Sequence, residues 1–216
     1  MTVPKLACIF DMDGVIVDNV SYHEKAWMEF GKKHGVTVTK KIFDEKISGR
    51  RNPEIVQILL GKKITGKELE QLSAEQPALY RELYKGKSKL IAGLEEFLKK
   101  CQRNNIPTAL ATSSPIENVE QLFNETNSRS FFNAITAQHD VTKGKPDPEI
   151  YLLSAKKLGV KSKYCIVFED SLSGVASGKN ADMKVIGITT THTPEELHQA
   201  DKTIKDYTEI TLEDLA

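Results

Sequence analysis

The chain has 216 residues, enough for one large domain or for a core domain carrying a smaller one. Its 30 basic and 30 acidic residues cancel, so nothing in the charge balance favours nucleic acid or a membrane surface as a partner. Apolar residues make up 39% and charged residues 28%, ordinary values for a globular protein. This composition leaves a small anionic molecule, held by a local basic patch, as the expected partner.

The three cysteines lie far apart and lack metal-binding spacing; they are Cys8, Cys101 and Cys165. Two of them stand in apolar runs, where a free thiol behaves as a small hydrophobic group. We therefore expect free thiols and a cytoplasmic protein, since disulfides belong to oxidising compartments. The apolar run at 6–10 is too short for a signal peptide, and no stretch is long enough for a transmembrane helix. A monomer is expected.

Short apolar runs alternate with amphipathic helical patterns along most of the chain. Helical stripes recur from residue 94 onward, and Gly159 is typical of a residue that ends a helix. This alternation predicts an α/β fold with a Rossmann-like parallel sheet covered by helices on both faces. The runs with the length of a strand are residues 6–10, 106–111, 134–137, 164–168 and 185–188.

One long region after the first strand carries helical signals and no convincing strand. Ser21 opens a capping-box pattern that predicts a helix start, and Pro77 is expected to kink or interrupt the last helix of the region. We predict an all-helical cap domain over residues 18–90. It would be inserted into an α/β catalytic core formed by residues 1–17 and 91–216.

Polar side chains follow the predicted strands at their ends. In open α/β sheets, ligands bind beyond the carboxyl ends of the strands, so these side chains are candidates for a single site. Each motif alone has a structural explanation as a turn, a helix cap or a surface lysine. Their occurrence at the ends of successive predicted strands indicates a shared functional site. They are Asp11 and Asp13, then Thr112, Ser113 and Ser114, then Lys145, and finally Glu169 and Asp170.

These residue types suit phosphoryl transfer. A carboxylate can attack phosphorus, and a second acid two residues later can move the protons. Clustered carboxylates repel one another, and Mg²⁺ relieves that repulsion while binding phosphate oxygens. Hydroxyls and turn amides can hold phosphoryl oxygens, and a lysine adds a positive point charge.

The four motifs, in this order, resemble those of the haloacid dehalogenase-like phosphotransferases over nearly the whole chain. The resemblance implies that Asp11 is the nucleophile and Asp13 the general acid/base. It also implies that Thr112 and Ser113 hold the phosphoryl group, with Ser114 beside them. Because true dehalogenases lack the second acid, Asp13 argues against dehalogenation itself.

The resemblance extends to a lysine and a metal site. Lys145 matches the lysine of the third family motif. The implied cofactor is Mg²⁺, held by Asp11, the backbone carbonyl of Asp13 and Asp170. Glu169 completes the acidic motif and is a further candidate metal ligand.

Within the family, the β-phosphoglucomutase-like subgroup gives the nearest resemblance, at the segment 18–27 that leads into the cap. It implies that His23 contacts the acid/base aspartate when the cap closes. Arg50 and Arg51 are candidates for substrate recognition. Asn52 stands where the sugar phosphomutases carry an arginine.

Two further positions depart from the mutase pattern, because Gln76 and Pro115 replace lysines. A mutase must hold a bisphosphate at both ends, so each lost charge favours a phosphatase. We predict Mg²⁺-dependent hydrolysis of a small phosphorylated metabolite, such as a sugar phosphate, through an aspartyl-phosphate. A sugar phosphomutase is the alternative. A phospho-acceptor signalling module is a third interpretation, disfavoured by Asp13 and by the helical region.

Overall fold

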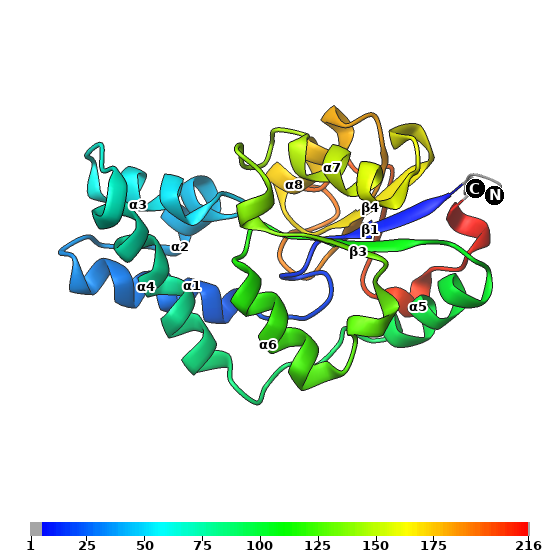
Figure 1. Cartoon of the computed structure of the whole chain (residues 1–216), viewed down its shortest axis with the longest axis horizontal. Helices are drawn as coiled ribbons and strands as arrows, with labels where there is room; N and C mark the ends of the chain where they lie inside the picture. Colours follow the sequence, from blue (N-terminus) through cyan, green and yellow to red (C-terminus); the bar gives the residue numbers. More distant parts are fainter. Residues whose placement is uncertain (1–5, 216) are drawn as a thin grey trace.

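A six-stranded parallel sheet with the order β3-β2-β1-β4-β5-β6 forms the centre of the molecule (Figure 1). The computed structural model describes residues 6–215, and the outer ends of the predicted core, 1–5 and 216, lie outside that range. The strands are β1 (Ala7–Phe10), β2 (Thr108–Ala111), β3 (Ala134–Thr136), β4 (Cys165–Glu169), β5 (Lys184–Ile188) and β6 (Lys202–Ile204).

Helices cover both faces of the sheet, as the strand–helix alternation predicts. Residues of β1 alternate between the faces: Ile9 packs with α7 and α8, whereas Phe10 packs with α5 and α6. Phe10 stacks on Phe168 of the neighbouring strand with the ring centroids 4.6 Å apart. These helices are α5 (Leu94–Arg103), α6 (Ile116–Thr126), α7 (Glu149–Leu158) and α8 (Leu172–Asn180).

Five of the six strands were predicted from apolar runs. The exception is β6, which has three residues, two of them Lys202 and Thr203, and lies at the edge of the sheet. An edge strand of this kind carries no apolar run. The short helical turns of the core are η2 (Arg129–Phe131), η3 (Gln138–Asp140), η4 (Ser162–Tyr164), η5 (Tyr207–Glu209) and η6 (Glu213–Leu215).

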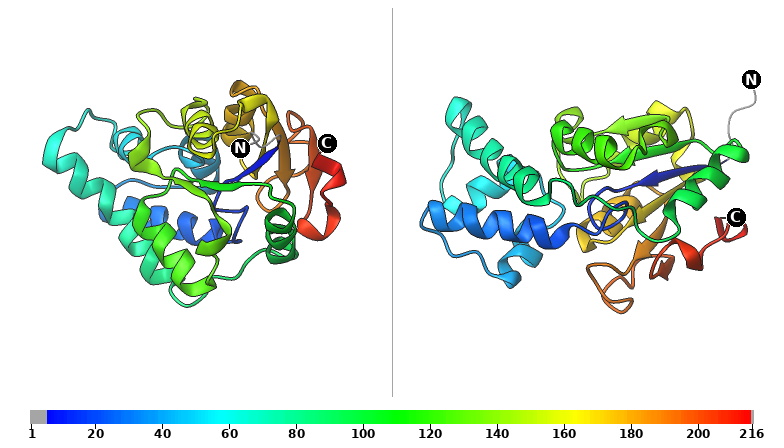
Figure 2. Two further views of the ribbon diagram at one scale, coloured as in Figure 1. Left: turned by 45° about the vertical axis from the view of Figure 1, so that its right-hand side comes forward. Right: turned by 90° about the horizontal axis from the view of Figure 1, so that it is seen from below.

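The residues from the N-cap of α1 to the end of α4 (residues 19–84) form a helical insertion at one end of the sheet (Figure 2). Trp27, Phe43 and Ile55 belong to an apolar cluster built from this insertion alone. Helix α4 packs along both α1 and α3. The elements are α1 (Val20–Lys33), α2 (Lys40–Ile42), the π-helical turn η1 (Phe43–Ile47), α3 (Asn52–Leu60) and α4 (Gly66–Tyr84).

The chain leaves the core for the insertion and returns to it at neighbouring points. Val17 and Leu90 form an antiparallel bridge, and the Ile91 amide donates to the Ile16 carbonyl at 2.9 Å. The two connections therefore lie side by side, although more than 70 residues separate them in sequence. A pair of adjacent connections of this kind is a natural position for a hinge.

Within the insertion, the capping box predicted at Ser21 is wrong, and so is the interruption, one of the two effects expected of Pro77. Helix α1 begins at Val20 with Asn19 as its N-cap residue, so Ser21 lies in the first turn and caps nothing. Pro77 does not interrupt α4, which runs unbroken past it. Proline lacks the amide that would bond to the carbonyl four residues earlier. That carbonyl, on Ser73, accepts the Asn52 side-chain amide at 3.4 Å instead, so its hydrogen bond is replaced rather than lost.

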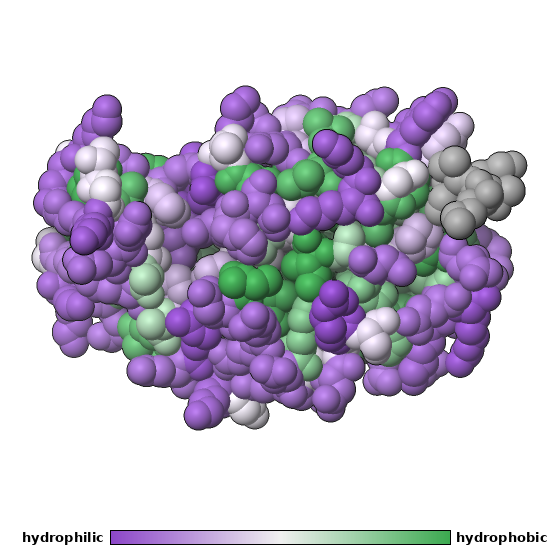
Figure 3. All heavy atoms as spheres, viewed as in Figure 1, coloured by the Kyte–Doolittle hydropathy of each residue, from purple (hydrophilic) through white to green (hydrophobic). Residues whose placement is uncertain are grey.

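The face seen in Figure 3 is mostly hydrophilic, with a hydrophobic area near its middle. Tyr151, Phe10 and Phe97 are among the largest of the fully buried side chains, and they lie between the sheet and its helices. Within residues 6–215, none of the helices combines the length and the apolar character needed to cross a bilayer.

Candidate active site

The predicted site residues meet at the carboxyl edge of the sheet. Asp11 directly follows β1, and its amide donates to the Phe168 carbonyl of β4 at 3.0 Å. Strand order reverses between β1 and β4, and such switch points are where open α/β sheets bind ligands. Asp11 and Asp170 thus leave adjacent strands and enter the same space.

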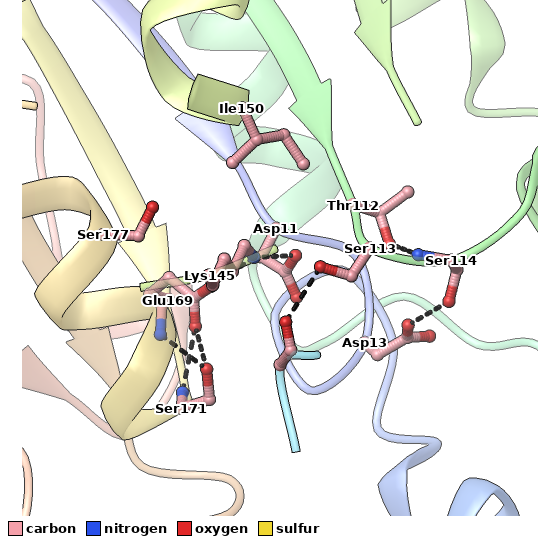
Figure 4. A network of polar contacts seen from close by, with 12 residues as sticks. Asp11, Asp13, Thr112, Ser113, Ser114, Lys145, Ile150, Glu169, Ser171 and Ser177 are labelled. Carbon is pink, nitrogen blue, oxygen red and sulfur yellow. Dashed lines mark hydrogen bonds and ion pairs between the residues drawn. The ribbon is translucent and has the colours of Figure 1, made fainter. Parts of the chain in front are cut away.

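Lys145 lies at the centre of the site and is 3% exposed. Its ammonium lies 2.6 Å from Asp11 Oδ1 and 2.5 Å from Glu169 Oε1 (Figure 4). Burial disfavours the charged ammonium, but the two carboxylates outweigh it and raise the pKa of Lys145 above its ordinary value. Lys145 therefore carries a permanent positive charge between two strand ends.

Glu169 is fully buried, and both of its carboxylate oxygens accept hydrogen bonds. Oε1 accepts from Lys145 and, at 2.8 Å, from the Tyr151 hydroxyl. Oε2 accepts from the amides of Asp170 and Ser171 and from the Ser171 hydroxyl. Although burial opposes ionisation, Lys145 and these donors lower the pKa of Glu169. Glu169 thereby ties the lysine to the first turn after β4.

Asp11 keeps its second oxygen, Oδ2, clear of the lysine and faces a cavity between the sheet edge and the insertion. Burial and the nearby carboxylates of Glu169 and Asp13 raise the pKa of Asp11 to about 8, although Lys145 acts in the opposite direction. Burial and the same cluster also raise the pKa of Asp170 well above its ordinary value. The single ammonium of Lys145 therefore does not balance the carboxylates of Asp11, Glu169 and Asp170.

The cluster suits a hard divalent cation. Carboxylate oxygens of Asp11, Glu169 and Asp170 lie within 4.8 Å of one another, and all three residues are buried. Magnesium prefers a few carboxylates together with phosphate and water oxygens, and its charge would offset the repulsion described above. Lys145, the ammonium inside this cluster, already bonds to two of its members.

Asp13 turns away from this cluster toward helix α1. Its Oδ1 accepts the Asn19 side-chain amide at 2.7 Å and lies 3.1 Å from His23 Nε2. Its Oδ2 accepts the Ser114 hydroxyl at 2.8 Å. Burial opposes ionisation, but His23 and these hydrogen bonds lower the pKa of Asp13 below its ordinary value. The structure thus brings His23 to the position that the resemblance implies.

His23 is held by two residues of helix α4. Its ring stacks on Tyr80 with a centroid distance of 3.8 Å and an interplanar angle of 11°. The Gln76 amide lies 3.4 Å from His23 Nδ1. Tyr80 also accepts the Asn19 amide through its hydroxyl at 2.6 Å. The carboxylate of Asp13 is therefore oriented by residues of the insertion at Oδ1 and by Ser114 of the core at Oδ2.

The hydroxyl residues after β2 share the site but differ in role. The Thr112 hydroxyl accepts the Ser114 amide at 3.0 Å and so shapes the turn. The Ser113 hydroxyl donates to the Gly49 carbonyl of the insertion at 3.0 Å. All three residues line the cavity, and the Ser114 hydroxyl already bonds to Asp13. The Ser113 segment is thus also a contact point between core and insertion.

The structure separates the two neighbouring arginines. Arg50 lines the cavity, as does Asn52, whereas Arg51 does not. Arg51 instead donates to the Thr142 carbonyl of the core, close to Glu54. Only one of the two predicted substrate-contacting arginines therefore faces the cavity, and the other joins the insertion to the core.

Several residues of the site carry no sequence signal that would have placed them there. Asn19 and Tyr80 contact Asp13 or its partners from the insertion, and Tyr151 contacts Glu169 from α7. Tyr80 and Tyr151 occupy ordinary apolar positions of amphipathic helices. Only Asn19, two residues before a predicted helix start, could have been noticed as an N-cap candidate.

The fold and the site define a class: α/β enzymes with a carboxylate and lysine centre at the switch point and a helical insertion above it. The family model described as haloacid dehalogenase-like hydrolase matches residues 6–182. The chain therefore belongs to the haloacid dehalogenase-like hydrolases, and it is an enzyme of the phosphatase and phosphomutase kind found among them.

Curated relatives include both phosphatases and a mutase. Hexitol phosphatase B of Escherichia coli (strain K12) is 27% identical, with 100% of this chain and 99% of that protein covered. The β-phosphoglucomutase of Bacillus subtilis (strain 168) is 28% identical, with 96% and 92% covered. A chloroplastic 5-amino-6-(5-phospho-D-ribitylamino)uracil phosphatase of Arabidopsis thaliana is 26% identical; the match covers 97% of this chain but only 57% of that protein.

Solved structures agree with this family. A hydrolase of the same family from Entamoeba histolytica, described as family IA, variant 3, superimposes with a TM-score of 0.87 at 32% identity, with 97% of each chain covered. The β-phosphoglucomutase of Clostridium difficile gives a TM-score of 0.86 at 28% identity, with 97% and 94% covered. Both likenesses extend over the core and the insertion together.

Gly14 provides a test of how closely the site is packed. It has a φ of +76°, and a Cβ added to it would lie 2.0 Å from Asp170 Oδ2. We expect Gly14→Ala to displace the Asp170 carboxylate and to abolish turnover. Gly35→Ala is the matched control, because Gly35 has a φ of +71° but nothing within 4 Å of an added Cβ.

The control should lower the free energy of unfolding by about 1–2 kcal/mol, the cost of the left-handed conformation alone. Gly14→Ala should cost more, because the clash adds to that strain. Urea denaturation and a phosphatase assay measure both effects. Wild-type activity in Gly14→Ala would contradict the packing described here.

Proposed function

We propose that this enzyme is a Mg²⁺-dependent phosphatase that hydrolyses a small phosphorylated metabolite, with a sugar phosphate or polyol phosphate as the substrate class. The observation that carries the proposal is the division of labour between Asp11 and Asp13. Both line one cavity, and Asp11 is held by the core lysine. Asp13, in contrast, is held by Asn19 and His23 of the insertion as well as by Ser114 of the core. The names of the hexitol phosphatase and β-phosphoglucomutase relatives support the substrate class.

In the proposed reaction, Asp11 Oδ2 attacks phosphorus and the bond to the leaving alcohol oxygen breaks. Asp13 gives that oxygen a proton. Water then attacks the aspartyl-phosphate, Asp13 takes the proton of that water, and inorganic phosphate leaves. The low pKa of Asp13 suits the second step, and the negative charge of an arriving phosphate favours the protonated form needed for the first.

We assign the metal to Asp11, Asp170 and the Asp13 backbone carbonyl. Bound Mg²⁺ would supply charge that offsets the developing charge of the phosphoryl group. Glu169 already accepts five hydrogen bonds, so we assign it to positioning Lys145 and the turn after β4 rather than to direct ligation. The Thr112–Ser114 turn would hold the phosphoryl oxygens.

We propose that residues 18–90 are a cap domain that closes over the core formed by the segments 1–17 and 91–216. Hydrogen bonds from Ser113 to Gly49, and from Ser173 to the Ser48 carbonyl at 3.3 Å, join the two parts beside the cavity. The Val17–Leu90 bridge marks the hinge. Closure would exclude water from the site, and the contact between His23 and Asp13 seen in the structure would belong to the closed form.

The charges of the cavity favour hydrolysis over mutase chemistry. Among the described residues that line it, the permanent cations are Arg50 and Lys145, and Lys145 is engaged by Asp11 and Glu169. Gln76 and Pro115, the positions of the mutase lysines, also line the cavity and are neutral. A bisphosphate would therefore find one arginine and His23 for its distal phosphate.

The nucleophile is tested by Asp11→Asn, with Asp44→Asn on the insertion surface as control. We expect Asp11→Asn to lose at least about 1,000-fold in kcat on p-nitrophenyl phosphate, because the amide cannot attack phosphorus. The control should keep wild-type activity. EDTA should inactivate the wild-type enzyme and Mg²⁺ restore it. Substantial activity in Asp11→Asn would remove Asp11 from the mechanism.

Phosphatase and mutase are separated by products. With a hexose 1-phosphate and a catalytic amount of hexose bisphosphate, the enzyme should release inorganic phosphate and form no hexose 6-phosphate. Phosphate release can be followed colorimetrically and isomerisation by a coupled dehydrogenase. Isomer formation faster than phosphate release would replace the phosphatase proposal with a mutase.

The two arginines should behave differently. Arg50→Ala should raise KM for a hexitol phosphate by about 10-fold, the loss of roughly one charge-assisted hydrogen bond, but leave KM for p-nitrophenyl phosphate nearly unchanged. Arg51→Ala removes a contact between insertion and core, so it should affect both substrates alike. Steady-state kinetics with the two substrates measure this. An equal effect of Arg50→Ala on both would argue against its role in substrate recognition.

A further inference from the structure

The segment that follows β5 contacts the site at three points, although no motif marks it. The Thr190 hydroxyl donates to the Gly14 carbonyl at 2.6 Å. The Thr191 hydroxyl donates to Asp170 Oδ2. The His192 ring places Nδ1 2.9 Å from the Asp170 carbonyl. This three-residue segment therefore contacts the turns after both β1 and β4.

The Asp170 carboxylate is fixed on two sides. Oδ2 lies against the α-carbon of Gly14, where a Cβ would come within 2.0 Å, and it accepts the Thr191 hydroxyl. Rotation of the carboxylate would break the hydrogen bond on one side or clash on the other. Within residues 6–215, Oδ1 accepts no hydrogen bond. Since Asp170 lines the cavity, Oδ1 is the oxygen left for a ligand.

Holding a metal-binding carboxylate in this way has an energetic effect. Groups that orient a ligand typically change metal affinity by 10–100-fold when they are removed, because the ligand must otherwise be ordered on binding. Threonine is well suited, because its branched Cβ restricts the rotamer that aims the hydroxyl. Asp170 is 3% exposed, so water has little access to replace a lost donor.

We propose that Thr191 is a positioning residue for the metal site, which fixes Asp170 Oδ2 so that Oδ1 faces the Mg²⁺ position. The inference rests on the proposed function, since it takes Asp170 as a metal ligand. Thr191 itself touches neither substrate nor metal in this assignment. His192 contacts the backbone carbonyl of Asp170 in the turn after β4. Thr190 donates to the backbone carbonyl of Gly14 in the turn after β1.

Titration of the EDTA-treated full-length enzyme with MgCl₂ alone, in a calorimeter, tests the proposal. Thr191→Val removes the hydroxyl and keeps the shape, and Thr191→Ser restores the hydroxyl. Thr189→Val is the matched control, because it removes the hydroxyl of a neighbouring threonine that donates to the Ile204 carbonyl of β6 instead of the turns after β1 and β4. Thermal unfolding in EDTA confirms that each variant is folded, and Thr191→Ala replaces Thr191→Val if the latter is not.

We expect Thr191→Val to raise the Kd for Mg²⁺ by about 10–100-fold. Thr191→Ser and Thr189→Val should stay within about 3-fold of the wild type, below that range. In turnover assays, the Mg²⁺ concentration at half-maximal rate should rise in Thr191→Val, whereas kcat at saturating Mg²⁺ should stay close to wild type. A purely structural role would lower kcat and stability without this selective shift.

Wild-type affinity for Mg²⁺ in Thr191→Val would overturn the inference and leave the proposed function standing. Equal weakening in Thr191→Val and Thr191→Ser, or in Thr191→Val and Thr189→Val, would also overturn it, because the hydroxyl on Asp170 would not be the cause. If the wild-type enzyme binds no Mg²⁺, the metal-dependent function itself fails and the inference fails with it.

Discussion

The site depends on a buried ammonium. Lys145 lies between Asp11 and Glu169, two carboxylates from different strands, and is nearly inaccessible to water. Removing one partner of such a pair typically costs about 3–5 kcal/mol, because the remaining charge stays buried without compensation. Lys145 therefore ties the Asp11 and Glu169 carboxylates together at the carboxyl ends of β1 and β4. The three carboxylates of the cluster outnumber this one ammonium, and a divalent cation would favour their ionised forms.

The two aspartates of the first motif are only two residues apart, yet they belong to different parts of the molecule. Asp11 is positioned by groups of the core that do not depend on the insertion. One oxygen of Asp13 is held by Ser114 of the core, and the other by Asn19 and His23 of the insertion, both of which contact Tyr80. Under the proposed closure, the nucleophile would be ready before the substrate is enclosed, whereas the acid/base would be oriented only afterwards. Proton transfer would then be confined to the closed enzyme.

The fold and the positions of the main polar residues could be predicted from sequence, because local patterns of apolar and polar residues indicate them. Apolar runs marked five strands, and the polar residues after them marked the site, since parallel strands bring their carboxyl ends to one edge. Contacts between distant segments left no such signal. In the sequence, Tyr80 looks like a core residue of its helix. At Pro77, the side-chain amide of Asn52 replaces the backbone amide that proline lacks and bonds to the Ser73 carbonyl. Arg50 and Arg51 are adjacent and chemically identical, so the sequence cannot show which of them lines the cavity and which contacts the core.

The pairing of Val17 with Leu90 has a consequence for how such enzymes diversify. The chain leaves the core and returns to it at two neighbouring positions. The distance between these two ends is therefore set by the core and does not depend on the residues between them. Helices within the insertion could be lengthened, exchanged or rearranged without moving a strand of the sheet. Under the proposed division of roles, the insertion would set the substrate range and the core the reaction chemistry, so the two properties could evolve at different rates. Asp13 would be the catalytic residue at which the two parts meet.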